Sequence, residues 1–123
     1  MERIVRAIRG ATTASANTRE AIEDAVVELL DVLESKNPLN PGHIVSVTFS
    51  VTPDLDAVFP AAIARQRSSL QAVPLLDVQQ MMVKGSLPKC IRLLMTINAL
   101  DSDPPVHHVY LRQAKTLRPD LQG

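Results

Sequence analysis

A chain of 123 residues is long enough for one domain with a substantial core, and we expect a single domain spanning residues 1–123. Apolar residues make up 46% of the sequence, which is typical of a globular protein and excludes an intrinsically disordered one. The 13 basic and 13 acidic residues give a formal net charge of zero, which argues against nucleic acid or an anionic membrane as the main partner.

The N-terminal part of the chain predicts a short strand followed by a long amphipathic helix. Residues 4–9 favour β-structure, and we expect this strand to end at Gly10. Asn17 is a good N-cap residue and Glu20 stands at the spacing of a capping box, so the helix should begin there. It should run to about Lys36, before an Asn-Pro sequence. Its apolar residues recur at helical spacing and should form one buried face: Ile22, Ala25, Val26, Leu29, Leu30 and Leu33.

The middle of the chain predicts two more strands and a short helix. Residues 44–51 alternate in polarity as a half-buried strand does, with these residues on one face: Val45, Val47, Phe49 and Val51. Pro60 suits the first position of a short helix. A short strand broken by Pro74 is expected over residues 72–76, and residues 77–86 are expected to form a connecting loop or an irregular edge.

A strand over residues 89–98 contains an unexpected charge. Its two faces carry Ile91, Leu93, Met95 and Ile97 on one side, and Cys90, Arg92, Leu94 and Thr96 on the other. A buried guanidinium without a partner is strongly unfavourable. Arg92 can reach water, pair with a structural carboxylate or bind an anionic ligand, and the local pattern leaves all three open.

The last expected strand covers residues 107–112. It places Val109 and Leu111 on one face and these three residues on the other: His108, Tyr110 and Arg112.

These elements predict an α+β fold, with a mixed β-sheet and two helices packed on one face. The other face then needs a cover, because its strands carry apolar residues such as Leu94 and either Phe49 or Val51. A second subunit is the economical cover, so we expect a homo-oligomer.

The expected location follows from three features of the sequence. Cys90 is the single cysteine, so an internal disulfide is excluded and a reducing compartment fits. The first ten residues are charged and lack the apolar core of a secretory signal. No apolar run approaches the roughly 20 residues of a membrane span. We therefore expect a cytoplasmic protein with no membrane partner.

The candidates for a binding site are arginines that lie inside predicted strands or beside predicted ends of elements: Arg9, Arg65, Arg92 and Arg118. Structural explanations also exist, such as a solvated strand end for Arg9 or a half-buried core position for Tyr110. Adjacent His107 and His108 would point to opposite faces of a strand, so no metal site is expected. Cys90 has no convincing local base, and the glycines form no phosphate loop. The residues alone predict an arginine-bearing pocket for a small anion and do not name a reaction.

Five segments of the sequence together resemble the AroH-class chorismate mutases. These segments are RAIRGATT, SVTPDLDAVFPA, GSLPKCIRLLMT, HHVYL and LRPDL. They stand in the family's order with compatible spacing and cover nearly the whole chain. The resemblance implies an isomerase that converts chorismate to prephenate in phenylalanine and tyrosine biosynthesis. It also implies a homotrimer of α+β subunits that resembles a pseudo α/β-barrel, with active sites at the subunit interfaces.

The reaction implied by this resemblance is an intramolecular Claisen rearrangement, which needs no nucleophile, metal or cofactor. Negative charge grows on the ether oxygen as its bond to carbon breaks, so a fixed cation beside that oxygen favours the transition state. Holding the flexible enolpyruvyl arm over the ring supplies the rest by orientation.

The resemblance also assigns roles to residues. Arg92 matches the arginine that contacts the ether oxygen and a carboxylate. Arg9 and Tyr110 match the residues that hold the side-chain carboxylate. The other expected substrate-binding residues are Phe59 as an aromatic wall, Arg65 at the rim, Leu75 and Leu76 on the short strand, Met81, and Leu117 and Arg118 in a C-terminal segment that closes over the site.

Three positions depart from the family pattern. Asp77 stands where the family has a cysteine, and Gln80 replaces a glutamate that faces the ring hydroxyl and the positive charge developing on the carbocycle. Gln80 keeps a hydrogen-bond acceptor but lacks the charge. We hypothesise that Asp77 takes over this charge, which makes Arg92, Gln80 and Asp77 the expected catalytic residues. Ala62 stands where a lysine often occurs, which weakens electrostatic capture of a dianion.

Two other interpretations remain open from the sequence. The first is a catalytically weakened anion-binding trimer, for which Gln80 is the main support. The second is a trimeric α+β imine deaminase, which also places arginines in interface pockets but matches no segment of this chain. Turnover of chorismate would distinguish the mutase from both.

Overall fold

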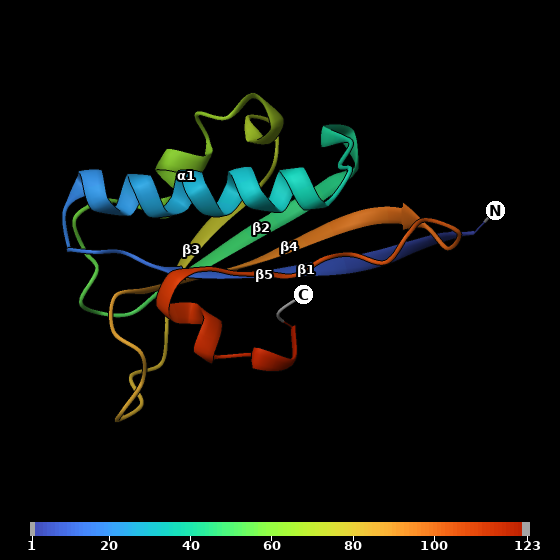
Figure 1. The fold of residues 1–123 in the computed structure, drawn as a ribbon. Coiled ribbons are helices and arrows are strands. Elements are labelled where there is room, and N and C mark those ends of the chain that lie inside the picture. The colour runs from blue at the N-terminus through green and yellow to red at the C-terminus, as the bar shows by residue number, and fades with distance from the viewer. Residues whose placement is uncertain (1, 122–123) are drawn as a thin grey trace.

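The structure, a computed structural model, describes residues 2–121 and contains a five-stranded mixed sheet in the order β3-β2-β4-β1-β5 (Figure 1). The strands are β1 (Arg3–Thr13), β2 (Ile44–Val51), β3 (Leu75–Gln79), β4 (Cys90–Leu100) and β5 (Val109–Tyr110). The α-helices are α1 (Arg19–Lys36) and α2 (Pro60–Ala64). Four short 3-10 helices complete the chain: η1 (Pro41–His43), η2 (Ser68–Leu70), η3 (Arg112–Thr116) and η4 (Pro119–Leu121).

The two faces of the sheet have different covers. β4 pairs antiparallel with β1 and β2, whereas β3 joins β2 and β5 joins β1 in parallel. α1 crosses one face, which we call the helical face, and α2 packs against α1. The C-terminal segment lies on the opposite side, which we call the open face (Figure 1). The predicted α+β fold, with both helices on one side of a mixed sheet, is therefore confirmed.

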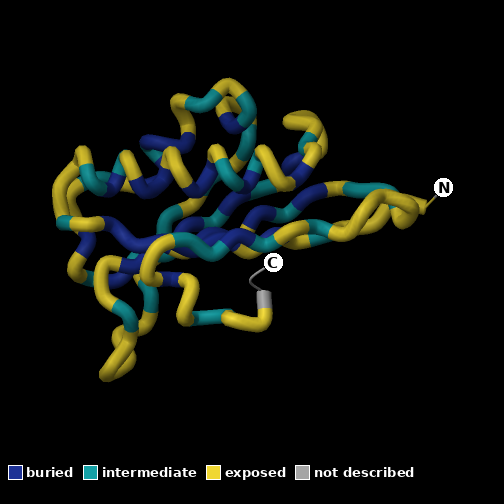
Figure 2. The backbone as a smooth tube through the Cα atoms, viewed as in Figure 1, coloured by how far each residue is buried: buried dark blue, intermediate teal, exposed yellow. Residues whose placement is uncertain are grey.

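The core lies between α1 and the helical face of the sheet. All six apolar residues predicted to form the buried face of α1 are buried. The β4 residues that face them are at most 8% exposed: Ile91, Leu93, Met95 and Ile97. Figure 2 shows these buried positions along α1 and the central strands, whereas the loop after β3 is exposed. The helical periodicity and the alternation in β4 were therefore sufficient to predict the main core.

The start of α1 differs from the prediction by one residue. Thr18 is the N-cap, and its hydroxyl accepts a hydrogen bond from the Ala21 amide at 3.1 Å. Asn17 instead holds a distant loop, because its side-chain oxygen accepts from the Asp56 and Ala57 amides at 3.0 and 3.1 Å. Neither α1 nor any other described helix is long and apolar enough to cross a membrane.

Two strands near the centre of the sheet also differ from expectation. β1 continues through Gly10 to Thr13, because its last residues pair with the start of β4. A register shift near the start of β2 leaves Val45 41% exposed. Phe49 is fully buried and Val51 packs against the same core, so both lie on the helical face, and the expectation that one of them is on the open face is wrong.

The edge strands are the elements that the sequence predicted least well. β3 begins after Pro74, so the proline precedes the strand and does not break it. Asp77 lies inside β3, opposite Phe49 of β2, although residues 77–86 were predicted to form a connecting loop or an irregular edge. β5 has only two residues, because Arg112 adopts a left-handed conformation with φ of 53° and turns the chain away.

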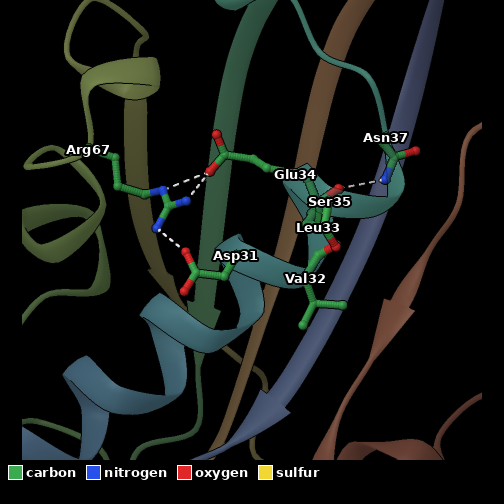
Figure 3. A network of polar contacts seen from close by, with 7 residues as sticks. All are labelled: Asp31, Val32, Leu33, Glu34, Ser35, Asn37 and Arg67. Carbon is green, nitrogen blue, oxygen red and sulfur yellow. Dashed lines mark hydrogen bonds and ion pairs between the residues drawn. The ribbon is translucent and has the colours of Figure 1, made fainter.

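Polar contacts attach two connecting segments to α1, and Figure 3 shows the first of them, at Arg67. Arg67 donates to Glu34 through Nε at 2.7 Å and to Asp31 at 2.9 Å, which ties the segment before η2 to the helix. Burial lowers the pKa of Arg67, but these carboxylates raise it more, so the net shift is upward. The buried Asn37 side chain exchanges hydrogen bonds with the backbone of His107 at 2.9 and 2.8 Å. These contacts hold the far end of α1 against the connection to β5.

Candidate active site on the open face

Strand register brings three of the predicted site residues together on the open face. Arg92 of β4 pairs directly with Ala11 of β1, and Ala11 pairs on its other side with Tyr110 of β5. Arg9 lies two residues before Ala11, so its side chain leaves the same face. Diagonal neighbours in a sheet are about 7–8 Å apart. Arg9, Arg92 and Tyr110 can therefore contact one small molecule.

A cavity of about 400 Å³ lies between this part of the sheet and the C-terminal segment. The sheet contributes Arg9, Arg92 and Tyr110, and the C-terminal segment contributes Leu117 and Arg118. Figure 1 shows the segment running beneath the strands on the side opposite α1. Five of the predicted site residues therefore line one cavity.

The cavity has a positive character. No ion pair within residues 2–121 involves Arg9 or Arg92. Arg118 pairs with Asp120, its neighbour on the same segment, at 2.8 Å. Arg92 is exposed on the open face. Because it has no carboxylate partner among the described residues, contact with water and binding of an anionic ligand are the two explanations that remain for its charge. Two guanidinium groups without carboxylate partners suit an anionic ligand.

A polar clamp fixes the start of β4, two residues before Arg92. The Thr52 hydroxyl donates to Asp54 and accepts from the Cys90 amide at 3.0 Å. The other Asp54 oxygen accepts from the amide of Lys89 at 2.9 Å, and Lys89 has a left-handed φ of 49°. Burial raises the pKa of Asp54, but the hydrogen bonds from Thr52 and Lys89 lower it more, so the net shift is downward. The ionised carboxylate thereby stabilises the left-handed turn at Lys89, from which β4 leads to Arg92.

Arg9 is fixed through its backbone. Its amide donates to Nδ1 of His108 at 2.9 Å, so that nitrogen carries no proton. Burial lowers the pKa of His108, and the nearby charges of Arg9 and Arg118 lower it further. A neutral imidazole therefore supports the cavity, and the positive charge there belongs to the arginines.

Five other predicted binding residues do not line this cavity. Phe59, Leu76 and Met81 are 70%, 58% and 80% exposed. Arg65 is exposed at the end of α2, and Leu75 packs against the core on the helical face. The structure of one chain thus divides the predicted site into a first group that lines the cavity and a second group that does not.

Gln80 lies just beyond β3, and its amide donates to the carbonyl oxygen of Val51 at 2.8 Å. It continues the alternation after Val78 and so belongs to the same face as Arg92. Within the described part of the chain its Oε1 is buried without a hydrogen-bond partner. It lines a second cavity of about 310 Å³ together with Met81. An acceptor in this state can take a hydrogen bond from a ligand or another chain.

Asp77 lies on the helical face and does not line the cavity. Its carboxylate accepts a hydrogen bond from the Ala61 amide in the first turn of α2 at 3.0 Å. Burial raises the pKa of Asp77, and the Ala61 amide and the Arg65 charge oppose this rise only in part. The hypothesis that Asp77 takes over the charge missing at Gln80 is not supported by this placement.

Sequence reasoning missed the polar floor of the cavity. Thr48 and Ser50 line it from β2, and Leu94 lies between them and β1. The signal was present in the alternation of residues 44–51, which sets Thr48 and Ser50 on the face opposite Phe49. Throughout the described residues, no group of three or more His, Cys, Asp or Glu side chains could hold a metal ion.

Fold and site together define a small α+β protein with an arginine-lined cavity on the uncovered face of its sheet. The family model of chorismate mutase type I matches residues 5–121. The chain belongs to this family.

Named relatives agree with this assignment. The chain is 42% identical over 118 residues to the chorismate mutase AroH of Bacillus subtilis (strain 168), covering 96% of this chain and 93% of that protein. It is 45% identical over 121 residues to the chorismate mutase AroH of Thermus thermophilus, covering 98% of each. A solved chorismate mutase from Clostridium thermocellum superposes with a TM-score of 0.80 at 41% identity, covering 90% of this chain and 98% of that one.

Proposed function

We propose that this chain is an isomerase that rearranges chorismate to prephenate in the cavity between the open face and the C-terminal segment. The observation that carries the proposal is the pair Arg9 and Arg92, set on one face by strand register without carboxylate partners among the described residues. Chorismate carries two carboxylates, which two guanidinium groups can bind. Family membership supports the same reaction.

Arg92 is proposed as the catalytic residue, and Arg9 and Tyr110 as substrate-binding residues. In the transition state the ether C–O bond breaks and negative charge grows on that oxygen. A guanidinium held near the start of β4 stabilises this charge without reorganising during the reaction. Arg9 and Tyr110 then hold the side-chain carboxylate, so that the enolpyruvyl arm stays over the ring.

Gln80 is proposed to contact the other end of the substrate. Its unpartnered Oε1 can accept a hydrogen bond from the ring hydroxyl. An amide stabilises positive charge on the carbocycle less than a carboxylate does, because it carries only a dipole. Replacing Gln80 with glutamate should therefore raise kcat if this residue faces the carbocycle.

The second group of predicted residues supports a shared site in a homotrimer. Phe59, Leu76 and Met81 are large, apolar and exposed, and they do not line the cavity of their own chain. They would complete the cavity of a neighbouring subunit, as a wall opposite its arginines. Burying such residues between subunits also removes their apolar surface from water.

Steady-state turnover tests the proposed reaction, followed as loss of the chorismate enolpyruvyl absorbance. Arg92→Ala should lower kcat by about 100-fold or more, the effect of removing one preorganised transition-state contact. Arg3→Ala is the matched control, because Arg3 is exposed and shares its face of β1 with Arg9 but lies near the far end of the strand. No turnover by the unaltered trimer, with tight binding of a transition-state analogue, would instead establish an anion-binding protein.

A mixing experiment tests the shared site. Coexpressed Arg92→Ala and Phe59→Asp chains should form trimers in which some sites combine an intact Arg92 with an intact Phe59. Activity well above that of either variant alone is expected. Activity no greater than theirs, in trimers shown to contain both chains, would mean that both residues act within one subunit.

The proposal extends to the setting of the enzyme. Cys90 is free and buried, which suits a reducing compartment, and we place the protein in the cytoplasm, in the pathway to phenylalanine and tyrosine.

A further inference from the structure

The chain turns sharply where β5 ends and the C-terminal segment begins. Arg112 stands at this turn with φ of 53°, and besides Lys89 it is the only non-glycine residue with positive φ in the described part of the chain. A left-handed conformation is unfavourable for an arginine and persists only where its surroundings hold it. The turn sends η3 and the following residues beneath the open face (Figure 1).

The Arg112 side chain supplies contacts that can hold this turn. Its Nε donates to the Glu28 carboxylate on α1 at 3.0 Å, and its Nη1 donates to the carbonyl oxygen of Thr13 at the end of β1 at 3.0 Å. The amide of Gln113 lies 3.4 Å from the Thr13 hydroxyl. One guanidinium therefore joins the turn to the long helix and to a central strand.

The segment beyond the turn also packs against β1. Ala114 is fully buried, and its amide donates to Leu111 at 3.0 Å. Leu117 and Arg118 line the cavity, but the ion pair of Arg118 is with Asp120 on the same segment. The path by which the chain leaves β5 therefore contributes to the position of Arg118, together with the packing of η3 on β1.

We propose that Arg112, paired with Glu28, is a positioning residue that holds Leu117 and Arg118 against the cavity. Arg112 does not itself line that cavity. Its effect on catalysis rests on the proposed function, whereas its effect on the segment does not. The pair is 32% and 46% exposed, so its strength is modest and decreases with salt.

The variant that tests this proposal is Arg112→Asn. Asparagine tolerates positive φ better than most residues, so it removes the guanidinium with little added backbone strain. In this variant the substrate would have to order the C-terminal segment when it binds. Part of the binding free energy would be used for that ordering, so binding would be weaker. KM for chorismate should rise roughly threefold to tenfold, whereas kcat changes by less than about twofold.

Two further variants separate positioning from a general structural role. Glu28→Gln is nearly isosteric and leaves the Thr13 contact in place, so its effect on KM should be in the same direction and smaller. Exchanging the charges, with Arg112→Glu and Glu28→Arg together, should recover part of the loss that Arg112→Glu alone produces. Arg67→Ala is the matched control, because it removes an ion pair to α1 that does not involve the C-terminal segment (Figure 3).

Hydrogen exchange measured without substrate gives an independent readout. The amides of Ala114 and Leu117 should exchange faster in Arg112→Asn than in the unaltered protein. Their exchange rates should be unchanged in Arg67→Ala. If KM and these exchange rates stay unchanged in Arg112→Asn, the proposal is wrong. If the unaltered protein does not turn over chorismate, the proposed function fails, and the exchange rates still decide whether Arg112 holds the segment.

Discussion

Replacing Asp77 tests whether its carboxylate stabilises the fold on the helical face or acts on the substrate at the open face. In the structure this carboxylate accepts a hydrogen bond from the Ala61 amide, on the face opposite the cavity. α2 has five residues, and its N-cap Phe59 makes no side-chain cap hydrogen bond. Asp77 therefore provides the acceptor that the start of this helix needs. Replacing it should change stability and leave kcat nearly unchanged.

The expected magnitudes follow from this contact. Asp77→Ala removes the acceptor, which for a helix N-terminus costs about 1 kcal/mol and lowers Tm by roughly 3–6 °C in a domain of this size. Asp77→Asn keeps an acceptor oxygen. Because burial raises the pKa of Asp77 above its usual 3.8, protonation favours the folded state, and stability from this group is lost as pH rises. The asparagine resembles the protonated acid, so this variant should be at least as stable as the unaltered protein at pH 7.

The assay combines thermal unfolding at fixed protein concentration with steady-state kinetics of the same preparations. The fixed concentration matters because oligomer dissociation also shifts Tm. A fall in kcat of tenfold or more in Asp77→Asn, with Tm unchanged, would refute the reasoning. It would mean that the carboxylate acts on the substrate after all and that the hydrogen bond to Ala61 is incidental.

Two other predictions concern the strand that carries Arg9. Gly10→Ala would place a Cβ 3.0 Å from Leu93 Cγ and 3.4 Å from Leu29 Cδ1, so we expect a loss of about 1–3 kcal/mol in unfolding free energy by denaturant titration. Gly42→Ala is the control, since its Cβ meets only the Asn40 side chain, at 3.4 Å, and an equal loss there would contradict the packing argument. Burial and the charge of Arg9 lower the pKa of His108 in the folded chain. As pH falls through about 6.5, the unfolded chain therefore binds a proton at this residue more readily than the folded chain does. Stability should fall as pH decreases from 7.5 to 5.5, and His108→Asn should weaken this dependence; an unchanged slope would refute it.

The main elements could be predicted because each depends on a local pattern. The apolar spacing of α1 and the alternation in β4 specify which residues are buried whatever the rest of the chain does. The start of α1 was less certain, because Asn17 and Thr18 are both good caps. The Asn17 side chain accepts hydrogen bonds from the loop amides of Asp56 and Ala57, and Thr18 caps the helix instead. That choice depends on a tertiary contact and was not available from local sequence.

The site was predictable in part, for the same reason. Arg92 stood out because a charge interrupts an apolar strand, but its position beside Arg9 and Tyr110 depends on the pairing of three strands. Pairing between distant strands has no local sequence signature. Leu117 and Arg118 line the cavity from beyond the turn at Arg112, so their placement there depends on tertiary structure after β5. The resemblance to a family supplied these residues, and the register explains why they meet.

The departures at Asp77 and Gln80 show what the alternation of a strand could have settled. Residues three apart on a strand point to opposite faces, so a carboxylate at Asp77 cannot replace one at Gln80 by a small shift. A connecting loop or an irregular edge over residues 77–86, as the sequence predicts, has no regular alternation of this kind. β3 in fact extends to Gln79, and the Gln80 amide continues its pairing with Val51. The two residues therefore have different surroundings: Asp77 supports the start of α2, and Gln80 leaves an uncharged acceptor on the face that carries Arg92.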